Sequence, residues 1–506
     1  MSTRRPSRRG TRNPRSIIQS PWQQPVNPYP PVELLNAEQL ERIHQASMSI
    51  LEDIGIDFLL PQACELLVQA GAQVDGQRVR MDRGMVLEYI RHAPSEFTFH
   101  ARNPAHSVQL GGQHIAYCTV GSAPNVSDLK GGRRVGNMAD FCDLIRLGQA
   151  LNCIHIIGGY PVEPIDLAVE TRHLDALKAT VELSDKPFHA YSLGRERIVD
   201  ALEITRIARG ISQQQLEQEP SLFTVINSSS PLRIDKPMLE GLIEMARNNQ
   251  IVVMTPFTLS GAMAPATLPG ALAQQSAEAL AGIVLTQIVR PGTPVMYGGF
   301  TSNVDMKSGA PAFGTPEYVK AAQIGGQLAR FYGLPYRSSN ATAANSVDGQ
   351  AAYESTMSLW GAIMGHANML MHGAGWLEGG LCASFEKMVL DAELLQMMSA
   401  YLTPLEVNDD TLALDAIREV GPGGHFFGCA HTMARYETAF YSPLVSDWHN
   451  FETWQDNGSP SATQHAHRLY QQFLAEYTPP PLDPASQEEL DAFVARRKEE
   501  GGAPPL

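Results

Sequence analysis

Polar and aromatic side chains gather where short apolar runs of this sequence end. The stretch Leu334 to Gly380 shows the pattern: a strand at 335–339 leads into a polar loop, Asp348 caps a helix, and a second strand ends in His372. Small and polar residues at strand ends allow close approach of a ligand, and loops held by a rigid scaffold are where function concentrates. The strand ends are therefore the candidate functional site.

The candidate residues offer rings, hydroxyls and amides, with one arginine and one histidine. The predicted substrate-binding residues are Tyr117, Tyr160, Arg337, Asn340, His372 and Glu378. Each has an alternative interpretation, since Tyr117 is equally a core residue and His372 a structural histidine. Arg337 needs an anionic partner wherever it lies, either an internal acid such as Glu378 or a bound anion.

Several familiar kinds of barrel chemistry lack their residues at these strand ends. No His-x-His follows the first strand, no lysine closes a strand, and no pair of carboxylates stands at strand ends, which disfavours metal-dependent amidohydrolases, Schiff-base aldolases and glycosidases. His425, Cys429 and His431 have a spacing like that of metal ligands, but no orienting carboxylate accompanies them. The pattern indicates a site that binds rather than attacks, with no resident metal and no catalytic residue from this chain.

Eight apolar, β-rich runs recur along the chain at intervals typical of βα units. They lie at 114–120, 154–160, 187–193, 222–227, 251–257, 294–300, 335–339 and 368–371. Helical periodicity occupies the intervals, at 166–184, 195–209, 236–248, 274–289 and 316–332. Eight such units predict an α/β fold, a (β/α)8 TIM barrel with an N-terminal helical extension and a C-terminal cap. A doubly wound open sheet is disfavoured because no GxGxxG follows a strand.

Composition limits the partners and the compartment. The net charge is −15, and six arginines fall within residues 1–16, so the remainder is more acidic still and is a poor partner for nucleic acid. The six cysteines form no CxxC pair, which fits a reducing cytoplasm. No uncharged run reads as a membrane span, because the longest one, 251–277, is broken by prolines. The oligomeric state stays open, and a homo-oligomer is compatible with the sequence.

The same reading divides the chain into five parts. Residues 1–32 are expected to form a disordered Arg/Pro-rich tail, 33–112 an N-terminal extension, and 113–385 the barrel. Residues 386–485 are expected to form a C-terminal helical cap and 486–506 a charged tail. A first helix is predicted to start at Asn36, where Gln39 completes a capping box.

A set of segments in a fixed order resembles the trimethylamine methyltransferase superfamily. They are NAEQLERIHQASMSILEDIGIDF, LKGGRRVGNMADF, DKPFHAYSL, FGTPEY, GQLARFYGLPYRSS, GAGWLEGG and GPGGHFFGCAHT, and the likeness covers most of residues 33–485. The resemblance implies a TIM barrel that passes a methyl group from a methylated amine to the cobalt of a separate corrinoid protein. Archaeal trimethylamine enzymes carry pyrrolysine, whereas this chain has standard residues throughout. It therefore resembles the non-pyrrolysine branch, whose known members use quaternary amines such as glycine betaine.

That resemblance also implies the roles of cofactor and partner. Cobalamin would be presented by the corrinoid partner rather than bound permanently, and its cobalt would be the nucleophile. Aromatic rings such as Tyr117 would hold the methylammonium by cation–π attraction. Two alternatives stay open: a TIM-barrel enzyme of another class without a corrinoid partner, and a non-catalytic betaine-binding protein.

Overall fold

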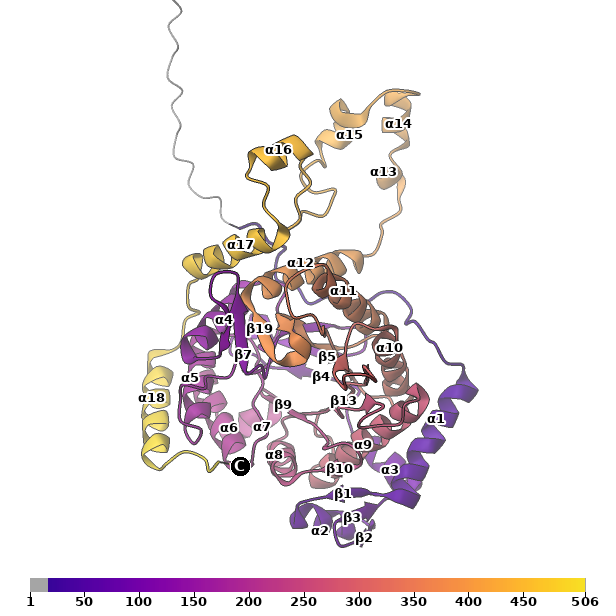
Figure 1. Cartoon of the computed structure of the whole chain (residues 1–506), viewed down its shortest axis with the longest axis vertical. Coiled ribbons are helices and arrows are strands. Elements are labelled where there is room, and N and C mark those ends of the chain that lie inside the picture. Colours follow the sequence, from indigo (N-terminus) through magenta and orange to yellow (C-terminus); the bar gives the residue numbers. More distant parts are fainter. Residues whose placement is uncertain (1–16, 506) are drawn as a thin grey trace, which may run out of the picture.

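The computed structural model describes residues 17–505, and its centre is a ring of parallel strands (Figure 1). Six regular strands build most of the ring: β6 (Ala116–Thr119), β9 (Phe223–Ile226), β11 (Ile251–Met254), β13 (Val295–Gly298), β16 (Tyr336–Ser339) and β17 (Met369–Ala374). Two short extended segments complete it between β6 and β9, through parallel bridges Cys118–Ile156, Ile157–Phe188 and His189–Phe223. Because β17 pairs with β6, the ring is closed. The predicted (β/α)8 barrel is confirmed.

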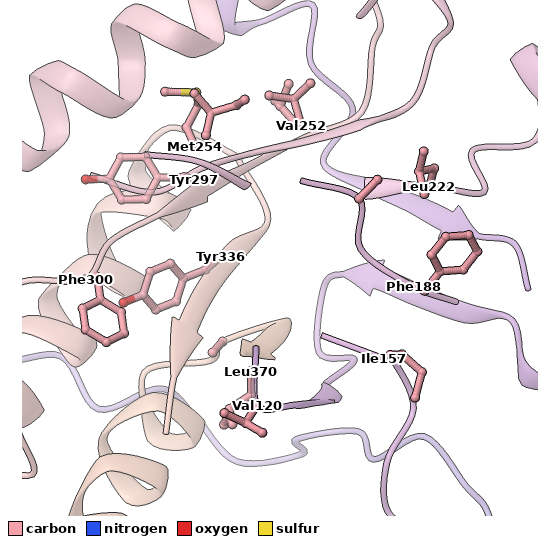
Figure 2. Packing of buried hydrophobic residues seen from close by; sticks show 14 of the residues in the cluster. Val120, Ile157, Phe188, Leu222, Val252, Met254, Tyr297, Phe300, Tyr336 and Leu370 are labelled. Carbon is pink, nitrogen blue, oxygen red and sulfur yellow. The ribbon is translucent and has the colours of Figure 1, made fainter. Parts of the chain in front are cut away.

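Side chains alternate between the inside and the outside of this ring. Outward residues pack against the helices, and Figure 2 shows Val120, Ile157, Phe188, Leu222, Val252, Tyr297 and Leu370 distributed around the strands. Inward residues such as Cys118 and Met369 form a separate cluster. That inner cluster includes Phe97 and Phe99 of β4 (Glu96–Phe99), with Val108 and Leu110 of β5 (Val108–Gly111), so the β4–β5 hairpin closes the N-terminal end of the barrel.

Helices surround the ring (Figure 1). They are α4 (Met138–Ala150), α5 (Arg172–Leu183), α6 (Arg195–Arg209), α8 (Lys236–Arg247), α9 (Leu268–Val289), α10 (Pro316–Phe331), α11 (Gly349–Met364) and α12 (Phe385–Tyr401). Local signals set their starts: the Asp348 carboxylate accepts hydrogen bonds from the first backbone N–H groups of α11, as predicted. The small helix α7 (Gln213–Gln218) precedes β9.

The N-terminal region packs beside the barrel. Its elements are α1 (Ala37–Ser49), β1 (Ile56–Phe58), α2 (Pro61–Gln69), β2 (Gln73–Asp75), β3 (Arg78–Arg80) and α3 (Arg83–Ile90). Asn36 and Gln39 form the predicted capping box at the start of α1. Strand β1 pairs with β10 (Arg233–Ile234), which ties the region to the loop after β9.

Small sheets built from loops cover the carboxyl ends of the barrel strands. One contains β7 (Asn125–Asp128), β8 (Gly132–Val135), β18 (Trp376–Leu377) and β19 (Cys382–Ser384); the other contains β12 (Leu259–Ser260), β14 (Ser302–Val304) and β15 (Pro311–Ala312). Active sites of (β/α)8 proteins lie at this end of the barrel. The loops therefore enclose the region where the site is expected.

The C-terminal part departs from the expected cap in two ways. Helix α12 follows β17 and packs against it with its Lys387–Asp391 ion pair buried, so it is the last helix of the ring rather than part of a cap after residue 385. Residues 403–457, here called the arm, extend beyond α12 and away from the barrel (Figure 1). The arm contains α13 (Asp409–Leu412), α14 (Leu414–Val420), α15 (Ala430–Met433) and α16 (Phe451–Asp456).

Both chain ends that the structure describes lie against the barrel. Helix α17 (Ala462–Glu476) packs on α12 and α4, and α18 (Pro484–Glu499) packs on α5 and α6. Residues 17–32, expected in a free tail, are extended but attached, since the Asn27 side chain donates to the Ile363 carbonyl at 2.9 Å. Residues 1–16 of the predicted tail lie outside the described part. None of the described helices is both long and apolar enough to cross a membrane.

Candidate functional site

A buried arginine without an acidic partner among the described residues lies inside the barrel, on β16. Arg337 is the inward residue after Tyr336 on β16, and its side chain is 2% exposed. Its guanidinium donates one long hydrogen bond, 3.4 Å, to the Gly299 carbonyl at the end of β13. Within residues 17–505 no carboxylate pairs with Arg337, and its Nε is unpartnered. Burial lowers the pKa of Arg337 to about 10, so the group is a cation at neutral pH.

This guanidinium lies against an aromatic ring of the loop after β13. Its carbon lies 5.5 Å from the ring centre of Phe300, which follows β13. Phe300 in turn contacts Phe313, Tyr318 and Trp376, with ring centres 5.2, 6.0 and 5.9 Å apart. We call Phe300, Phe313, Tyr318 and Trp376 the aromatic cluster. Phe300 and Phe313 come from the loop between β13 and α10, Tyr318 from the first turn of α10 and Trp376 from the loop after β17, and all are buried.

Unpartnered polar atoms accumulate at the same end of the barrel. Thr255 Oγ1, Ser339 Oγ, Asn340 Oδ1 and Trp376 Nε1 are buried and, like Arg337 Nε, lack a hydrogen-bond partner in the structure. Buried polar atoms are nearly always satisfied in folded proteins. Five such atoms, on or just after β11 and β16 and on the loop after β17, point to a polar ligand that completes their hydrogen bonds.

His372 lies beside Arg337 and stays uncharged. Burial, followed by the charge of Arg337, holds the pKa of His372 well below its usual value. Its Nδ1 accepts a hydrogen bond from the Gly121 N–H at 3.3 Å, so Nε2 carries the hydrogen of the neutral ring. The backbone φ of His372 is +54°, a conformation that costs energy for residues other than glycine and that is concentrated at functional sites.

Asn340 and Glu378 each contact a neighbouring segment of the chain. The Asn340 amide donates to the Gly373 carbonyl at 3.0 Å and so braces the end of β17 next to His372. Glu378 forms an ion pair with Arg133 of β8, with 2.9 Å between Nε and Oε2. Glu378 is therefore not the acid that neutralises Arg337, and the alternative of an internal Arg337–Glu378 bridge is removed.

Tyr117 and Tyr160 do not face the barrel interior. Tyr117 points outward from β6, and its hydroxyl lies 3.5 Å from Ser399 on α12. Tyr160 packs on Phe141 of α4, with ring centres 5.6 Å apart, and lines a cavity of 80 Å³ with α5 and α6 residues. The structure thus brings Arg337, His372 and Asn340 together and separates both tyrosines from them.

Tyr117 is consequently expected to matter for stability rather than for ligand binding. Tyr117→Ala should lower the free energy of unfolding by about 3–5 kcal/mol, because it removes a fully buried ring from the interface between β6 and α12. Tyr117→Phe should change little. Denaturant unfolding measures the first effect, and a loss of ligand affinity in a fully folded Tyr117→Phe protein would contradict this placement.

The aromatic cluster is the part of the site that strand-end reasoning did not identify. Its members lie beyond the strand ends, separated by up to 76 positions in the sequence, from Phe300 to Trp376. The sequence signal was the presence of aromatic residues in two of the strand-to-helix loops, those after β13 and after β17. His425, Cys429 and His431 lie on the arm, and among residues 17–505 no three His, Cys, Asp or Glu side chains gather as metal ligands.

The fold and the arrangement of the site together define the class of protein. The chain is a (β/α)8 protein whose buried polar and aromatic groups converge at the carboxyl ends of the strands, where such barrels carry their active sites. A sequence model described as "Trimethylamine methyltransferase (MTTB)" matches residues 1–502. The chain belongs to that family and is a methyltransferase.

Individual relatives agree with this assignment. A glycine betaine methyltransferase of Desulfitobacterium hafniense is 38% identical over 94% of this chain and 98% of its own length. A trimethylamine methyltransferase of the same species is 30% identical over 92% of this chain and 94% of its own. Among solved structures, the monomethylamine methyltransferase of Methanosarcina barkeri has a TM-score of 0.53 at 10% identity, covering 88% of both chains, and this shows the shared fold.

Proposed function

We propose that this protein moves a methyl group from a quaternary, betaine-type amine to the cobalt of a separate corrinoid protein. The observation that carries the substrate class is Arg337, a buried cation with no acidic partner among the described residues. A buried charge is costly unless it is paired. A purely cationic amine would be repelled by it, whereas a zwitterion brings the missing carboxylate.

The two ends of a betaine match the two kinds of group at the site. Its carboxylate would accept charge-assisted hydrogen bonds from the Arg337 guanidinium, whose Nε is unpartnered. Its trimethylammonium group would pack against the aromatic cluster, because aromatic rings attract quaternary cations with about 0.5–2 kcal/mol each. The neutral state of His372 avoids a second positive charge beside the ammonium group.

In this reaction the role of the chain is to bind and orient the substrate. The cobalt centre of the partner protein supplies the nucleophile. The methyl carbon–nitrogen bond breaks with its electron pair left on nitrogen, so a neutral tertiary amine departs and no proton donor is required. The positive charge on nitrogen fades as this bond breaks, so cation–π attraction favours the ground state. Orienting one methyl group in a water-free site is therefore the main contribution of the barrel.

Substrate access requires a movement of the loops that cover the carboxyl ends of the barrel strands. Arg337 and Phe300 are only 2% and 4% exposed. Phe300 and Phe313 flank the β14–β15 hairpin, whose turn is exposed at Met306. A shift of this hairpin would open the site on one side and return the two rings once the substrate is bound. We place the reaction in the cytoplasm, where the six cysteines would stay as the free thiols seen here.

The proposal is tested by incubating the protein with a reduced corrinoid protein and a panel of methylated amines while the cobalt absorption spectrum is followed. Glycine betaine and other quaternary amines with a carboxylate should methylate the cobalt. Trimethylamine and choline should react slowly or not at all. A barrel that binds betaine without changing the spectrum would be a binding protein, and activity that needs no corrinoid would place it in another enzyme class; either result overturns the proposal.

Substrate affinity is expected to be independent of pH around neutrality. His372 stays neutral because its pKa is lowered, and Arg337 stays charged because its pKa remains near 10. Neither group changes charge between about pH 6 and pH 9. Calorimetric titration with glycine betaine across this range should give one dissociation constant, and a change centred near pH 6.5 would show that His372 titrates in the site.

A further inference from the structure

The arm exposes far more apolar surface than a free surface normally carries. Its six most prominent aromatic side chains are Phe426, Phe427, Tyr436, Phe440, Trp448 and Phe451, which are 43–85% exposed. At roughly 200 Å² for a whole side chain, these rings alone present about 800 Å² to solvent. That summed area equals what one partner contributes to a standard interface. We therefore expect the aromatic side chains of the arm to be buried in a protein–protein interface.

A second apolar surface lies on the helices from which the arm departs. Between Ala352 and Trp360, the exposed residues of α11 include no charged side chain. They include Tyr353, Met357 and Trp360, which share one face of α11 and are 60%, 41% and 40% exposed. Met397 and Tyr401 of α12 are 46% and 48% exposed, and the Trp360 and Tyr401 rings are 5.5 Å apart. We call these five residues the α11–α12 patch; tyrosine, tryptophan and methionine are the residue types enriched at protein interfaces.

We propose that two copies of this chain form a dimer in which the arm of each covers the α11–α12 patch of the other. One chain carries both surfaces, and a two-fold axis makes their pairing reciprocal, so the assembly closes at two copies. The two reciprocal arm–patch contacts of the dimer would together bury roughly 2,000 Å² or more, the range of permanent and strongly apolar interfaces. The inference does not depend on the proposed methyl-transfer reaction.

The location of the arm favours a second copy over the corrinoid partner as its occupant. In Figure 1 the view looks into the ring of helices, and the arm leaves from the side of that ring, beyond α12. A methyl-accepting partner must instead approach the carboxyl ends of the strands and dissociate after each transfer. The arm's attachment is firm, because the Glu393 carboxylate of α12 accepts hydrogen bonds from the Tyr441 hydroxyl at 2.7 Å and the Leu444 N–H at 2.6 Å.

Sedimentation equilibrium of the full chain tests the dimer. The expected mass is about twice the 55.2 kDa of one chain. Phe440→Glu on the arm and Trp360→Glu on the α11–α12 patch should each weaken the dimer at least about 30-fold, the effect of losing one interface hot spot. Val68→Glu is the matched control, since Val68 is 52% exposed on α2, away from both surfaces, and should leave the mass unchanged. Circular dichroism checks that each variant is folded.

Mixing the two variants tests the reciprocal pairing. A heterodimer of Phe440→Glu and Trp360→Glu places both substitutions in one arm–patch contact and leaves the other contact intact. The mixture should therefore dimerise more tightly than either variant alone. A monomeric wild-type chain would overturn the proposal. So would a dimer that is insensitive to both substitutions, or a mixture without recovery, which would mean that arm meets arm. The proposal would also be overturned if the arm bound the corrinoid protein and the chain stayed monomeric without it.

Discussion

Arg337→Met should reduce methyl transfer from glycine betaine by about two orders of magnitude or more without destabilising the protein. Removing one half of a buried, hydrogen-bonded charge pair typically costs 2–5 kcal/mol of binding, and here the other half would be the substrate carboxylate. In the absence of substrate the guanidinium has no acidic partner within residues 17–505. Replacing it with an apolar side chain of similar length removes a buried charge, so the melting temperature should stay equal or rise.

Arg330 provides the matched control at the opposite end of a neighbouring element. It lies in the last turn of α10 and already has partners, with 3.2 Å to Glu33 and 2.8 Å to the Gly365 carbonyl. Arg330→Met should lose some stability and keep its activity, the reverse of Arg337→Met. Kinetic assays and thermal unfolding of both variants decide the matter. An Arg337→Met protein that is unstable, or that is stable and fully active, would mean that Arg337 has no substrate role.

Trp376→Leu should weaken glycine betaine binding about tenfold while Trp376→Phe retains most of the affinity. The Trp376 ring lies 4.2 Å from the ring of His372 and 5.9 Å from that of Phe300, so it forms one wall of the aromatic cluster. Tryptophan binds cations most strongly among the aromatic residues, and the expected loss corresponds to one such contact. The effect should appear in KM more than in kcat, since the attraction fades as the methyl group leaves.

Trp454→Leu is the corresponding control, because Trp454 lies on the arm, where its indole N–H donates to the Pro460 carbonyl. It should leave the kinetics of betaine turnover unchanged. Equal KM values for wild type, Trp376→Leu and Trp454→Leu would exclude the aromatic cluster as the ammonium site.

The barrel could be predicted from sequence because each strand and helix carries its own local signal. The apolar runs at 251–257 and 335–339 match β11 and β16, and the Asp348 cap marks the start of α11. The direction of side chains could not be predicted as well. In β6 both faces are buried, so Ala116, Tyr117, Cys118 and Thr119 show no polar alternation that would tell inside from outside. The prediction that Tyr117 lines the site rested on its place at the end of the first strand, which does not tell which face its side chain takes.

The arm illustrates a second limit of sequence reasoning. Its phenylalanines and tryptophans have the composition of a core or a cap, and sequence gives no direct sign that these residues leave the body of the protein. Arg337 illustrates the opposite case. A single arginine within an apolar strand predicts a buried cation that needs an anion, and only the structure could show that Glu378 is engaged by Arg133 instead.

The most direct test of the central claim compares two ligands that differ in the carboxylate alone. Calorimetric titration of the wild-type protein with glycine betaine and with choline, the same cation with an alcohol in place of the acid, should show betaine binding at least about 100-fold more tightly. In Arg337→Met that preference should disappear, because the carboxylate then has no buried cation with which to pair. Equal affinities of the wild-type protein for both ligands, or a preference that survives in Arg337→Met, would contradict a zwitterionic substrate held by Arg337.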